Sequence, residues 1–442
     1  VADDRQEATL TGAFYDGLRE ARLADPALPG EQVDAAAPAL GRVECGDKRD
    51  ELALPADEGG LGLRKQADTL RRGSGRRTAA LSRLCGIFAA MSLLSLYDVH
   101  LRGRRDAPAL EFEDASGTVR AFTFGDLDAQ SDRLALELAA RGLAPGDRIA
   151  LLLPNSPAVI TLWLATLKLG AILVPINVLY TAREIAHIVR DAAPTAVITT
   201  NERTADVAEG IPVWELELLE DGAASRTPLR PLMATGAGTP AALIYTSGTT
   251  GAAKGAVLTH GNFAANALAL MHAWQLTSED RLLLTLPLFH VHGLGNGVNG
   301  WLASGGHLRL VERWEQSRAI GWFETYRPSL FYGVPTMFVR LLETPMERAR
   351  PVGAAMRLFV SGSAPLPAAV LEDFDRLFGH RILERYGMTE TLMNVSNPLH
   401  GERRAGTVGF PLPLTDVQIR DDRGRVAAVG ETGELFVRGP NV

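Results

Sequence analysis

The chain has 442 residues, of which 46% are hydrophobic and 22% are charged. This composition supplies a large apolar core and excludes a disordered, collagen-like or coiled-coil chain, and the length predicts two or three compact units. The formal net charge of −7 lacks the basic excess of a general nucleic-acid binder, although a local pocket could still hold an anionic ligand.

The first 90 residues differ in composition from the rest. They are rich in Ala, Gly, Asp, Glu and Arg, so we expect residues 1–90 to be a poorly ordered extension, with a regulatory domain as the alternative. Ordinary globular patterning begins at Met91. The apolar stretch 84–97 is too short to span a membrane and is predicted to be a buried amphipathic segment. Two cysteines, Cys45 and Cys85, are too few for a disulfide framework and favour a cytoplasmic location.

Helical and strand patterns alternate after residue 122. The spacing predicts a helix through Leu134 and Leu138 that ends near Gly142, and two further helices at 158–169 and 182–191. Strands are predicted at 147–154, 172–175 and 196–199. This repetition predicts an α/β fold with parallel sheets covered by helices. The pattern recurs after residue 241, and segments 417–420 and 433–438 are predicted to be short antiparallel strands.

One loop carries most of the chemical information. The apolar segment 243–245 enters a run of hydroxyls and glycines that ends at Lys254 and Gly255. Glycines allow backbone N–H groups to approach an anion, and the hydroxyls and the lysine add donors and positive charge, so the loop is equipped to hold a polyphosphate. The spacing differs from a Walker A loop. A flexible Gly/Thr loop without a ligand is the alternative.

This loop resembles the phosphate loop of the adenylate-forming superfamily, which includes acyl-CoA synthetases. The superfamily pattern is Tyr-Thr-Ser-Gly-Thr-Thr-Gly-x-Pro-Lys-Gly, and Ala253 stands here in place of the proline. Segment 384–390, Glu-Arg-Tyr-Gly-Met-Thr-Glu, is similar to the superfamily's Tyr-Gly-x-Thr-Glu motif. Segment 361–366 is similar to the loop that lines its adenine and acyl pockets. The resemblance covers residues 91–442.

The resemblance implies a fold, a reaction and a set of site residues. The fold is the large N-terminal domain of these enzymes, with two βαβ-type sheets between helices and an incomplete small β-barrel. The reaction joins a carboxylic acid to coenzyme A at the expense of ATP, with Mg²⁺ held by Thr246 and Glu390. The implied catalytic residues are Thr246, Lys254, Thr389 and Glu390. The implied nucleotide-binding residues are Thr246, Ser247, Gly248, Thr249, Thr250, Gly251, Lys254, Ser363, Ala364, Pro365, Glu384, Arg385, Tyr386, Gly387, Met388 and Thr389.

The acid is less well specified than the reaction. The resemblance places His290 and Ser361 beside the acyl group. In the malonyl-CoA synthetase branch an arginine at the place of Arg340 pairs with a distal carboxylate, so malonate or a methylmalonate-like dicarboxylate is expected. Alternatives are a surface ion pair for Arg340, a medium-chain fatty or aryl acid as substrate, or an inactive nucleotide-binding fragment. No metal site is expected at His290 and His292, because no further ligands cluster there.

Two other segments complete the predictions. Segment 295–300 matches G-x-G-x-x-G by letter, but it lacks a preceding strand and a suitably placed acid, so we expect a glycine-rich helix that packs closely against a neighbour. The superfamily pattern normally continues past residue 442 into a small C-terminal domain with a catalytic lysine. We therefore expect a chain that ends within its third subdomain, binds ATP weakly and turns over poorly. The sequence leaves the oligomeric state open.

Overall fold

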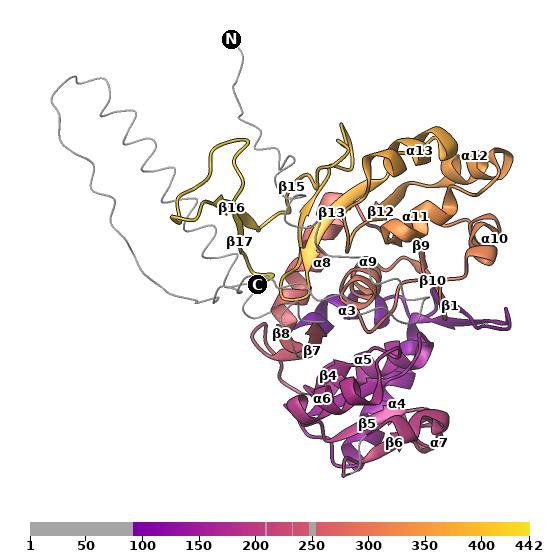
Figure 1. Cartoon of the computed structure of the whole chain (residues 1–442). Helices are drawn as coiled ribbons and strands as arrows, with labels where there is room; N and C mark the ends of the chain where they lie inside the picture. The colour runs from indigo at the N-terminus through magenta and orange to yellow at the C-terminus, as the bar shows by residue number, and fades with distance from the viewer. Residues whose placement is uncertain (1–91, 208–209, 232, 247–252) are drawn as a thin grey trace, which may run out of the picture.

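A computed structural model describes residues 92–207, 210–231, 233–246 and 253–442. Two sheets of six and nine strands, each packed against helices, make up most of this part of the chain (Figure 1). The predicted α/β class is therefore confirmed. The predicted extension 1–90 lies outside the described residues, as do Ser247, Gly248, Thr249, Thr250 and Gly251 of the phosphate loop.

The six-stranded sheet is parallel except at one edge, where β7 and β8 form an antiparallel hairpin. Its strands, in spatial order, are β6 (Val213–Glu215), β5 (Ala196–Thr199), β3 (Arg148–Leu152), β4 (Ile172–Pro175), β7 (Pro240–Thr246) and β8 (Lys254–Thr259). Its helices are α4 (Phe124–Ala140), α5 (Pro157–Leu169), α6 (Ala182–Ala192) and α7 (Leu216–Ala224), with a 3₁₀ turn η1 at Asn201–Asp206. The elements predicted between residues 124 and 199 are all present.

Local sequence explains where these helices begin and end. Thr123 caps α4 and Thr181 caps α6, each through a reciprocal capping box with the acidic residue three positions later. Helix α5 starts with Pro157 in its first turn and ends at Gly170, whose φ of 66° is the left-handed conformation that glycine adopts without strain.

The nine-stranded sheet has a parallel centre and antiparallel strands at both ends. In spatial order it contains β15 (Phe410–Pro411), β14 (Leu392–Ser396), β13 (Leu383–Met388), β12 (Leu358–Ser361), β11 (Leu330–Gly333), β9 (Arg281–Leu284), β10 (His307–Val311), β1 (Pro108–Glu113) and β2 (Val119–Thr123). The accompanying helices are α3 (Leu93–Leu101), α8 (His260–Trp274), the π-helix η2 (His292–Val298), α9 (Asn299–Ser304), α10 (Gln316–Tyr326), α11 (Pro335–Leu341), α12 (Met346–Ala355) and α13 (Ala368–Phe378).

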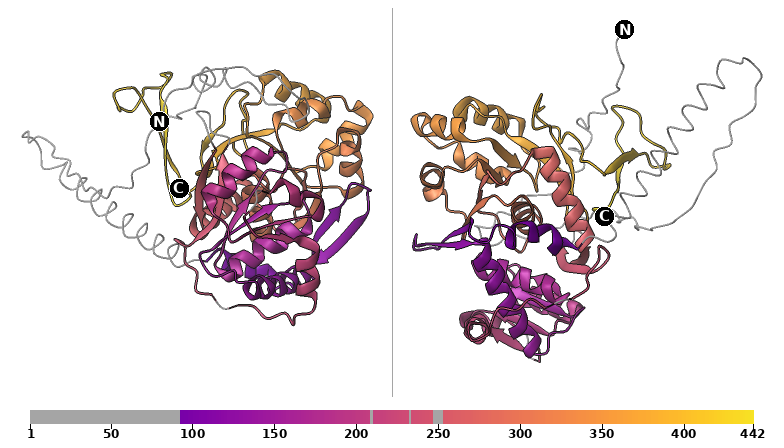
Figure 2. Two further views of the ribbon diagram at one scale, coloured as in Figure 1. Left: turned by 60° about the horizontal axis from the view of Figure 1, so that its bottom comes forward. Right: turned by 180° about the vertical axis from the view of Figure 1, so that it is seen from behind.

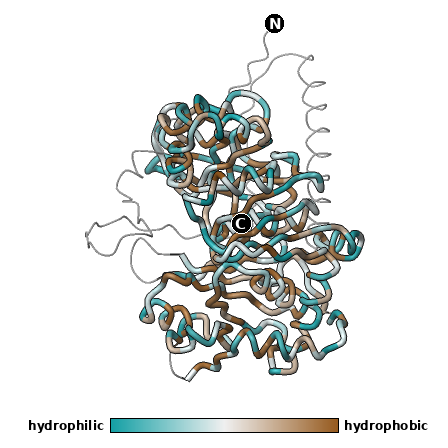
Figure 3. The backbone as a smooth tube through the Cα atoms, turned by 90° about the vertical axis from the view of Figure 1, so that its right-hand side faces the viewer, coloured by the Kyte–Doolittle hydropathy of each residue, from teal (hydrophilic) through white to brown (hydrophobic). Residues whose placement is uncertain are grey.

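The core is divided by the alternation of side chains along the strands. In β3, Ile149 and Leu151 point into the main core with α4 and α5, while Ala150 and Leu152 point to the opposite face, where α6 covers them. Strands of a parallel sheet are buried on both faces, and their sequences are therefore continuously apolar. Figure 3 shows hydrophobic stretches of chain running through the middle of the molecule.

A separate two-stranded ribbon follows the large sheets. Strands β16 (Asp416–Arg420) and β17 (Glu434–Arg438) pair in antiparallel fashion, as predicted, and lie apart from both sheets (Figures 1 and 2). The described residues contain no counterpart of a small C-terminal domain. Within those residues, no helix has the length and hydropathy needed to cross a bilayer. The predicted segment 84–97 is described only from residue 92, where Leu93 and Tyr97 of α3 are buried.

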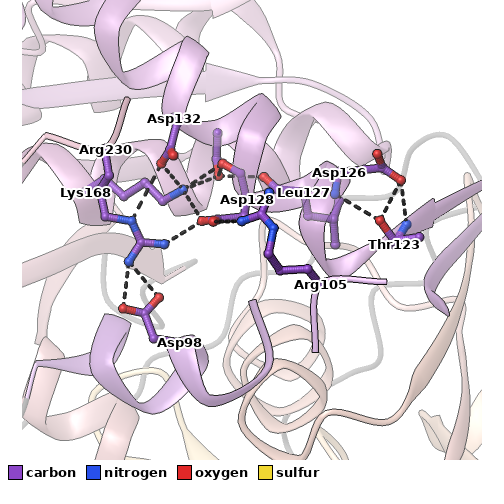
Figure 4. Close-up of polar contacts among 10 residues, drawn as sticks. Asp98, Arg105, Thr123, Asp126, Leu127, Asp128, Asp132, Lys168 and Arg230 are labelled. Carbon is purple, nitrogen blue, oxygen red and sulfur yellow. Dashed lines mark hydrogen bonds and ion pairs between the residues drawn. The ribbon is translucent and has the colours of Figure 1, made fainter. Parts of the chain in front are cut away.

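A buried ion network joins the first helices (Figure 4). Lys168 of α5 is fully buried, and its Nζ lies 2.9 Å from Asp128 Oδ1 and 2.5 Å from Asp132 Oδ1, both on α4. Arg230 also pairs with Asp128 and reaches Asp98 of α3 at 2.7 Å. The network thus ties α3, α4, α5 and the segment after α7 together at one point.

Candidate active site

A cavity is lined by residues at the carboxyl ends of strands from both sheets. Each lining residue either ends a strand or follows one at its carboxyl end: β4 and β7 of the six-stranded sheet, and β9 and β13 of the nine-stranded sheet. Open α/β sheets bind ligands at this end of their strands. The lining residues are Pro175, Asn177, Tyr180, Tyr245, Thr246, Phe289, His290 and Thr389.

The ends of the phosphate loop are held by the β7–β8 hairpin. Thr246 and Lys254 are cross-strand partners, and Thr246 Oγ1 donates to the carbonyl oxygen of Lys254 at 3.4 Å. Gly255 faces Tyr245, and a Cβ atom there would lie 2.7 Å from Leu243 Cδ1, so a larger residue would require the Leu243 side chain to move. Thr246 lines the cavity, and Lys254 is exposed at the start of β8.

The second motif lies on β13 and the turn after it. Thr389 lines the cavity, and Glu390 is exposed beside it. Burial and then the charge of Glu390 raise the pKa of Tyr386 to about 12, which indicates that these two side chains are neighbours. Gly387 sits at a bulge where a Cβ atom would meet the carbonyl oxygen of Leu392 at 2.1 Å. The two motifs that the sequence assigns to one nucleotide therefore border one cavity through Thr246 and Thr389.

The segment that follows β12 lies against β13. Ser363 has a φ of 70°, a costly conformation for a residue other than glycine, and its hydroxyl lies 3.0 Å from His292 Nδ1. Glu384 accepts a hydrogen bond from the backbone N–H of Leu366 at 2.8 Å. These contacts tie both ends of the Ser-Ala-Pro-Leu segment 363–366, and with it Ala364 and Pro365, to His292 and Glu384.

Several buried polar atoms in this region have no hydrogen-bond partner among the described residues. They are Ser361 Oγ, His292 Nε2, and Nε and Nη2 of Arg385. Arg385 lies directly against Gly362, where a Cβ atom would come within 2.4 Å of the guanidinium. Buried polar groups in native proteins are nearly always satisfied, by protein, by water or by a ligand, so these atoms are candidates to meet a bound molecule.

The electrostatics of this region follow from burial. Burial lowers the pKa of Arg385 to about 9, opposed only by the Tyr332 hydroxyl. Burial, and then the charge of Arg385, lower the pKa of His290 and hold the pKa of His292 well below its ordinary value. Both imidazoles are therefore neutral at pH 7, and the charge of the buried Arg385 lies close to both of them.

The structure does not bring Arg340 to this cavity. Arg340 lies on α11 and shares a face with Thr336, as predicted, but that face is exposed to solvent because Met337, Phe338 and Leu341 form the buried one. Its guanidinium lies 3.6 Å from Glu343. Arg340 borders a different surface hollow, between α10 and α11.

The glycine-rich segment packs as expected. It forms the π-helix η2 followed by α9, and Cβ atoms at Gly293 and Gly297 would lie 2.1 Å from the carbonyl oxygen of Pro287 and 2.7 Å from Leu284 Cδ1. The close-packing prediction is confirmed. The π-helix places His292 at its first residue, and single-turn π-helices are frequent at functional sites.

Sequence reasoning missed five of the eight residues that line the cavity, Pro175 among them. No ligand-binding role was predicted for four further lining residues, although each lies at or just beyond the carboxyl end of a strand: Asn177, Tyr180, Tyr245 and Phe289. That position is the signal that could have identified them. The resemblance assigned Arg385 to the nucleotide, but nothing in the sequence predicted its burial on β13.

Comparison with known proteins agrees with the motifs. Residues 97–442 match the family described as AMP-binding enzyme. The feruloyl-CoA synthase of an Amycolatopsis species is 33% identical over 332 residues, which cover 73% of this chain and 66% of that protein. The malonate–CoA ligase of Arabidopsis thaliana is 33% identical over 330 residues, which cover 68% of this chain and 54% of the ligase. The chain thus spans between about half and two thirds of the length of these curated relatives.

Comparison with solved structures also supports membership of this family. The crystal structure of ATP-bound MatB from Rhodopseudomonas palustris matches with a TM-score of 0.73 and 36% identity, over 80% of this chain and 71% of that one. The family match runs from α3 to the last residue and includes both sheets and every residue that lines the cavity. The chain belongs to the AMP-binding enzyme family, as its two motifs predicted.

Proposed function

We propose that this protein is an AMP-forming acid–CoA ligase that activates a short dicarboxylate of the malonate type. The observation that carries the proposal is that Thr246, His290 and Thr389, from three separate motifs, line one cavity. Residues of the phosphate loop and of the substrate-side motif therefore face one pocket, and adenylate formation requires the phosphates and the acid to meet at one place.

The reaction has two steps. In the first, a carboxylate oxygen of the acid attacks the α-phosphorus of ATP and pyrophosphate leaves, giving an acyl-adenylate. In the second, the thiolate of coenzyme A attacks the acyl carbon and AMP leaves. Charge neutralisation on the phosphates dominates the first step. Lys254 and the hydroxyls of Thr246 and Thr389 would supply it, with the loop residues 247–251.

The oxygen atoms of Glu390 and Thr246 are suitable ligands for a Mg²⁺ ion that enters bound to the nucleotide. Mg²⁺ usually binds one or two carboxylates and completes its shell with substrate phosphates and water. Glu390 provides one carboxylate beside the cavity, and Thr246 provides a hydroxyl within it. The bound ion would offset phosphate charge as a Lewis acid. Tyr386 and Gly387 would lie against the adenine, with Met388 and the 363–365 segment.

The buried guanidinium supports a dicarboxylate. An isolated buried cation is unfavourable, and a carboxylate that makes paired hydrogen bonds to it would relieve that cost. Arg385 is buried, has two unpartnered nitrogens and lies near both His290 and His292. We assign it to the distal carboxylate of the acid, in place of the exposed Arg340, with the Ser361 hydroxyl as a further donor.

A second candidate is an aryl acid. The cavity contains the aromatic rings of Tyr180, Tyr245 and Phe289, which suit a planar substrate. A relative is named feruloyl-CoA synthase. An aryl or medium-chain fatty acid would leave Arg385 without an anionic partner, which disfavours both.

Pyrophosphate exchange tests the proposal. ATP–pyrophosphate exchange is measured with malonate, methylmalonate, propionate, ferulate and octanoate, using the chain alone and with the C-terminal third of a relative added. We expect exchange with the two dicarboxylates. Arg385→Met should reduce their apparent affinity by about 30-fold or more, the effect of removing one partner of a buried charge pair. Arg340→Ala, the matched control, should leave it unchanged. Exchange with ferulate or octanoate but not malonate would reject the dicarboxylate, and exchange with no acid would reject the ligase.

A further inference from the structure

Helix α6 contacts both ends of the phosphate loop. His187 Nε2 lies 2.9 Å from the carbonyl oxygen of Ala253, the residue immediately before Lys254. Asp191 Oδ2 accepts a 2.6 Å hydrogen bond from the hydroxyl of Tyr245, the residue immediately before Thr246. His187 and Asp191 are four positions apart on one helix and so share a face. One face of one helix therefore holds both arms of the β7–β8 hairpin.

Helix α6 is a firm support for these contacts. Its N-terminus is closed by the reciprocal hydrogen bonds of Thr181 and Glu184. Its apolar face, with Ile185 and Ile188, is buried against the six-stranded sheet, on the face to which Ala150 and Leu152 of β3 point. Tyr245 belongs to this buried group of side chains, so helix α6 and the hairpin pack against each other as well as being hydrogen-bonded.

We propose that His187 is a positioning residue that orients Lys254 for the nucleotide phosphates, and that Asp191 holds the opposite arm through Tyr245. The carbonyl of Ala253 and the backbone nitrogen of Lys254 belong to one planar peptide unit, so fixing that oxygen fixes where the lysine leaves the backbone. Alanine at position 253 does not restrict φ as a proline would, which leaves this restraint to the histidine. The inference rests on the proposed function, because it assumes that Lys254 meets phosphate.

The contact defines the hydrogen-bonding role of the ring. A carbonyl oxygen only accepts, so Nε2 of His187 carries the proton in this contact. A glutamine amide reaches about as far as Nε2 and also donates, whereas leucine fills similar space without a donor. His187→Gln and His187→Leu therefore separate the hydrogen bond from the packing.

ATP titration of the full chain with Mg²⁺ present tests the role. We expect His187→Leu to weaken ATP binding about 3- to 10-fold at an unchanged melting temperature, the range that one hydrogen bond supports. His187→Gln should restore most of the affinity. Arg190→Ala, an exposed change on the same helix, should have no effect. If the leucine variant does not fold, His187→Ala takes its place. Equal affinities for the variants with and without a donor would overturn the inference.

A double-mutant cycle separates this inference from the function on which it rests. Because His187 acts through Lys254, His187→Leu should cost nothing further in a Lys254→Ala chain. Additive losses would show that the histidine acts independently and would overturn the positioning role. ATP binding by the unmodified chain, with equal binding by His187→Leu, would refute this inference alone. No ATP binding by the unmodified chain would refute the proposed function as well.

Discussion

Replacing Lys168 with methionine tests how strongly the buried ion network stabilises the fold. The side chain is fully buried, and its ammonium contacts two carboxylates, the Ser131 hydroxyl and the carbonyl oxygen of Asp128 (Figure 4). Methionine matches the length and volume of lysine but removes the charge and all donors. Asp128 and Asp132 then share the guanidinium of Arg230, and Asp128 keeps its pair with the half-exposed Arg105.

The expected loss is large for a single substitution. Removing one partner of a buried ion pair typically costs 3–5 kcal/mol, because the remaining charge is left unpaired in a poorly polarisable interior. Arg230 continues to compensate Asp128, so we expect the lower end, about 3 kcal/mol. For a chain of this size that corresponds to a fall in melting temperature of roughly 4 °C.

The pH dependence identifies the cause of the loss. Burial alone would raise the pKa of Asp128, but Lys168 and then Arg230 outweigh burial and hold the pKa below its ordinary value. A lowered folded-state pKa gives stability that is present above the unfolded pKa, near 4, and is lost as the pH falls through the folded pKa. Without Lys168 the pKa of Asp128 should rise. Protonation of Asp128 at low pH would then remove the unpaired buried charge and reduce the destabilisation of the Lys168→Met variant. The difference in stability between the two proteins should therefore narrow below about pH 5.

Urea unfolding, followed by circular dichroism between pH 4.5 and 8, measures this difference. Arg105→Met is the matched control, because Arg105 also pairs with Asp128 but about half of its side chain is exposed. Such exposed pairs contribute about 1 kcal/mol or less. A loss for Lys168→Met no larger than that of the control, or a loss independent of pH, would refute the reasoning.

Three further changes probe the site and the surface. Gly255→Ala would place a Cβ atom 2.7 Å from Leu243 Cδ1, the end of a side chain that can turn aside, so ATP affinity should change little; isothermal titration measures this, and a large loss would show that the hairpin cannot adjust there. Gly387→Ala would place a Cβ atom 2.1 Å from the carbonyl oxygen of Leu392, a backbone clash, so its melting temperature should fall by several degrees. Arg348→Ala breaks only an exposed pair and should leave the melting temperature unchanged; a clear fall would mean that this surface pair is worth more than others of its kind.

The sequence predicted the local elements well because their signals are local. The strands expected at 172–175 and 196–199 have those bounds in the structure, since apolar runs between glycine, proline and polar residues fit only buried strands. The expected ends of α5 follow from Pro157 and Gly170 in the same way. The phosphate loop and the Tyr-Gly-Met-Thr-Glu motif were recognisable because the chemistry is contained in short segments.

Arg340 shows where such reasoning stops. Helical periodicity correctly placed it on one face with Thr336, but periodicity alone does not say which face meets the core. The apolar residues Met337, Phe338 and Leu341 decide that, and they leave Arg340 in solvent. The burial of Arg385 was equally unpredictable, because it depends on Gly362 of a neighbouring strand rather than on its own motif.

Asn155 explains why the site depends on how the two sheets meet. It follows β3 of the six-stranded sheet, yet its buried amide donates to the carbonyl oxygens of Leu286 and Val311 and accepts from the N–H of Leu288, all in the nine-stranded half. Residues 286–288 lead directly into the segment that presents His290 to the cavity. The acyl side of the site is thus held by a residue of the opposite sheet, 131 positions or more away in sequence. A cavity formed in this way has its shape set by long-range packing, whereas the residues assigned to the chemistry come from short motifs, and this division is why the sequence points to a reaction more readily than to an acid.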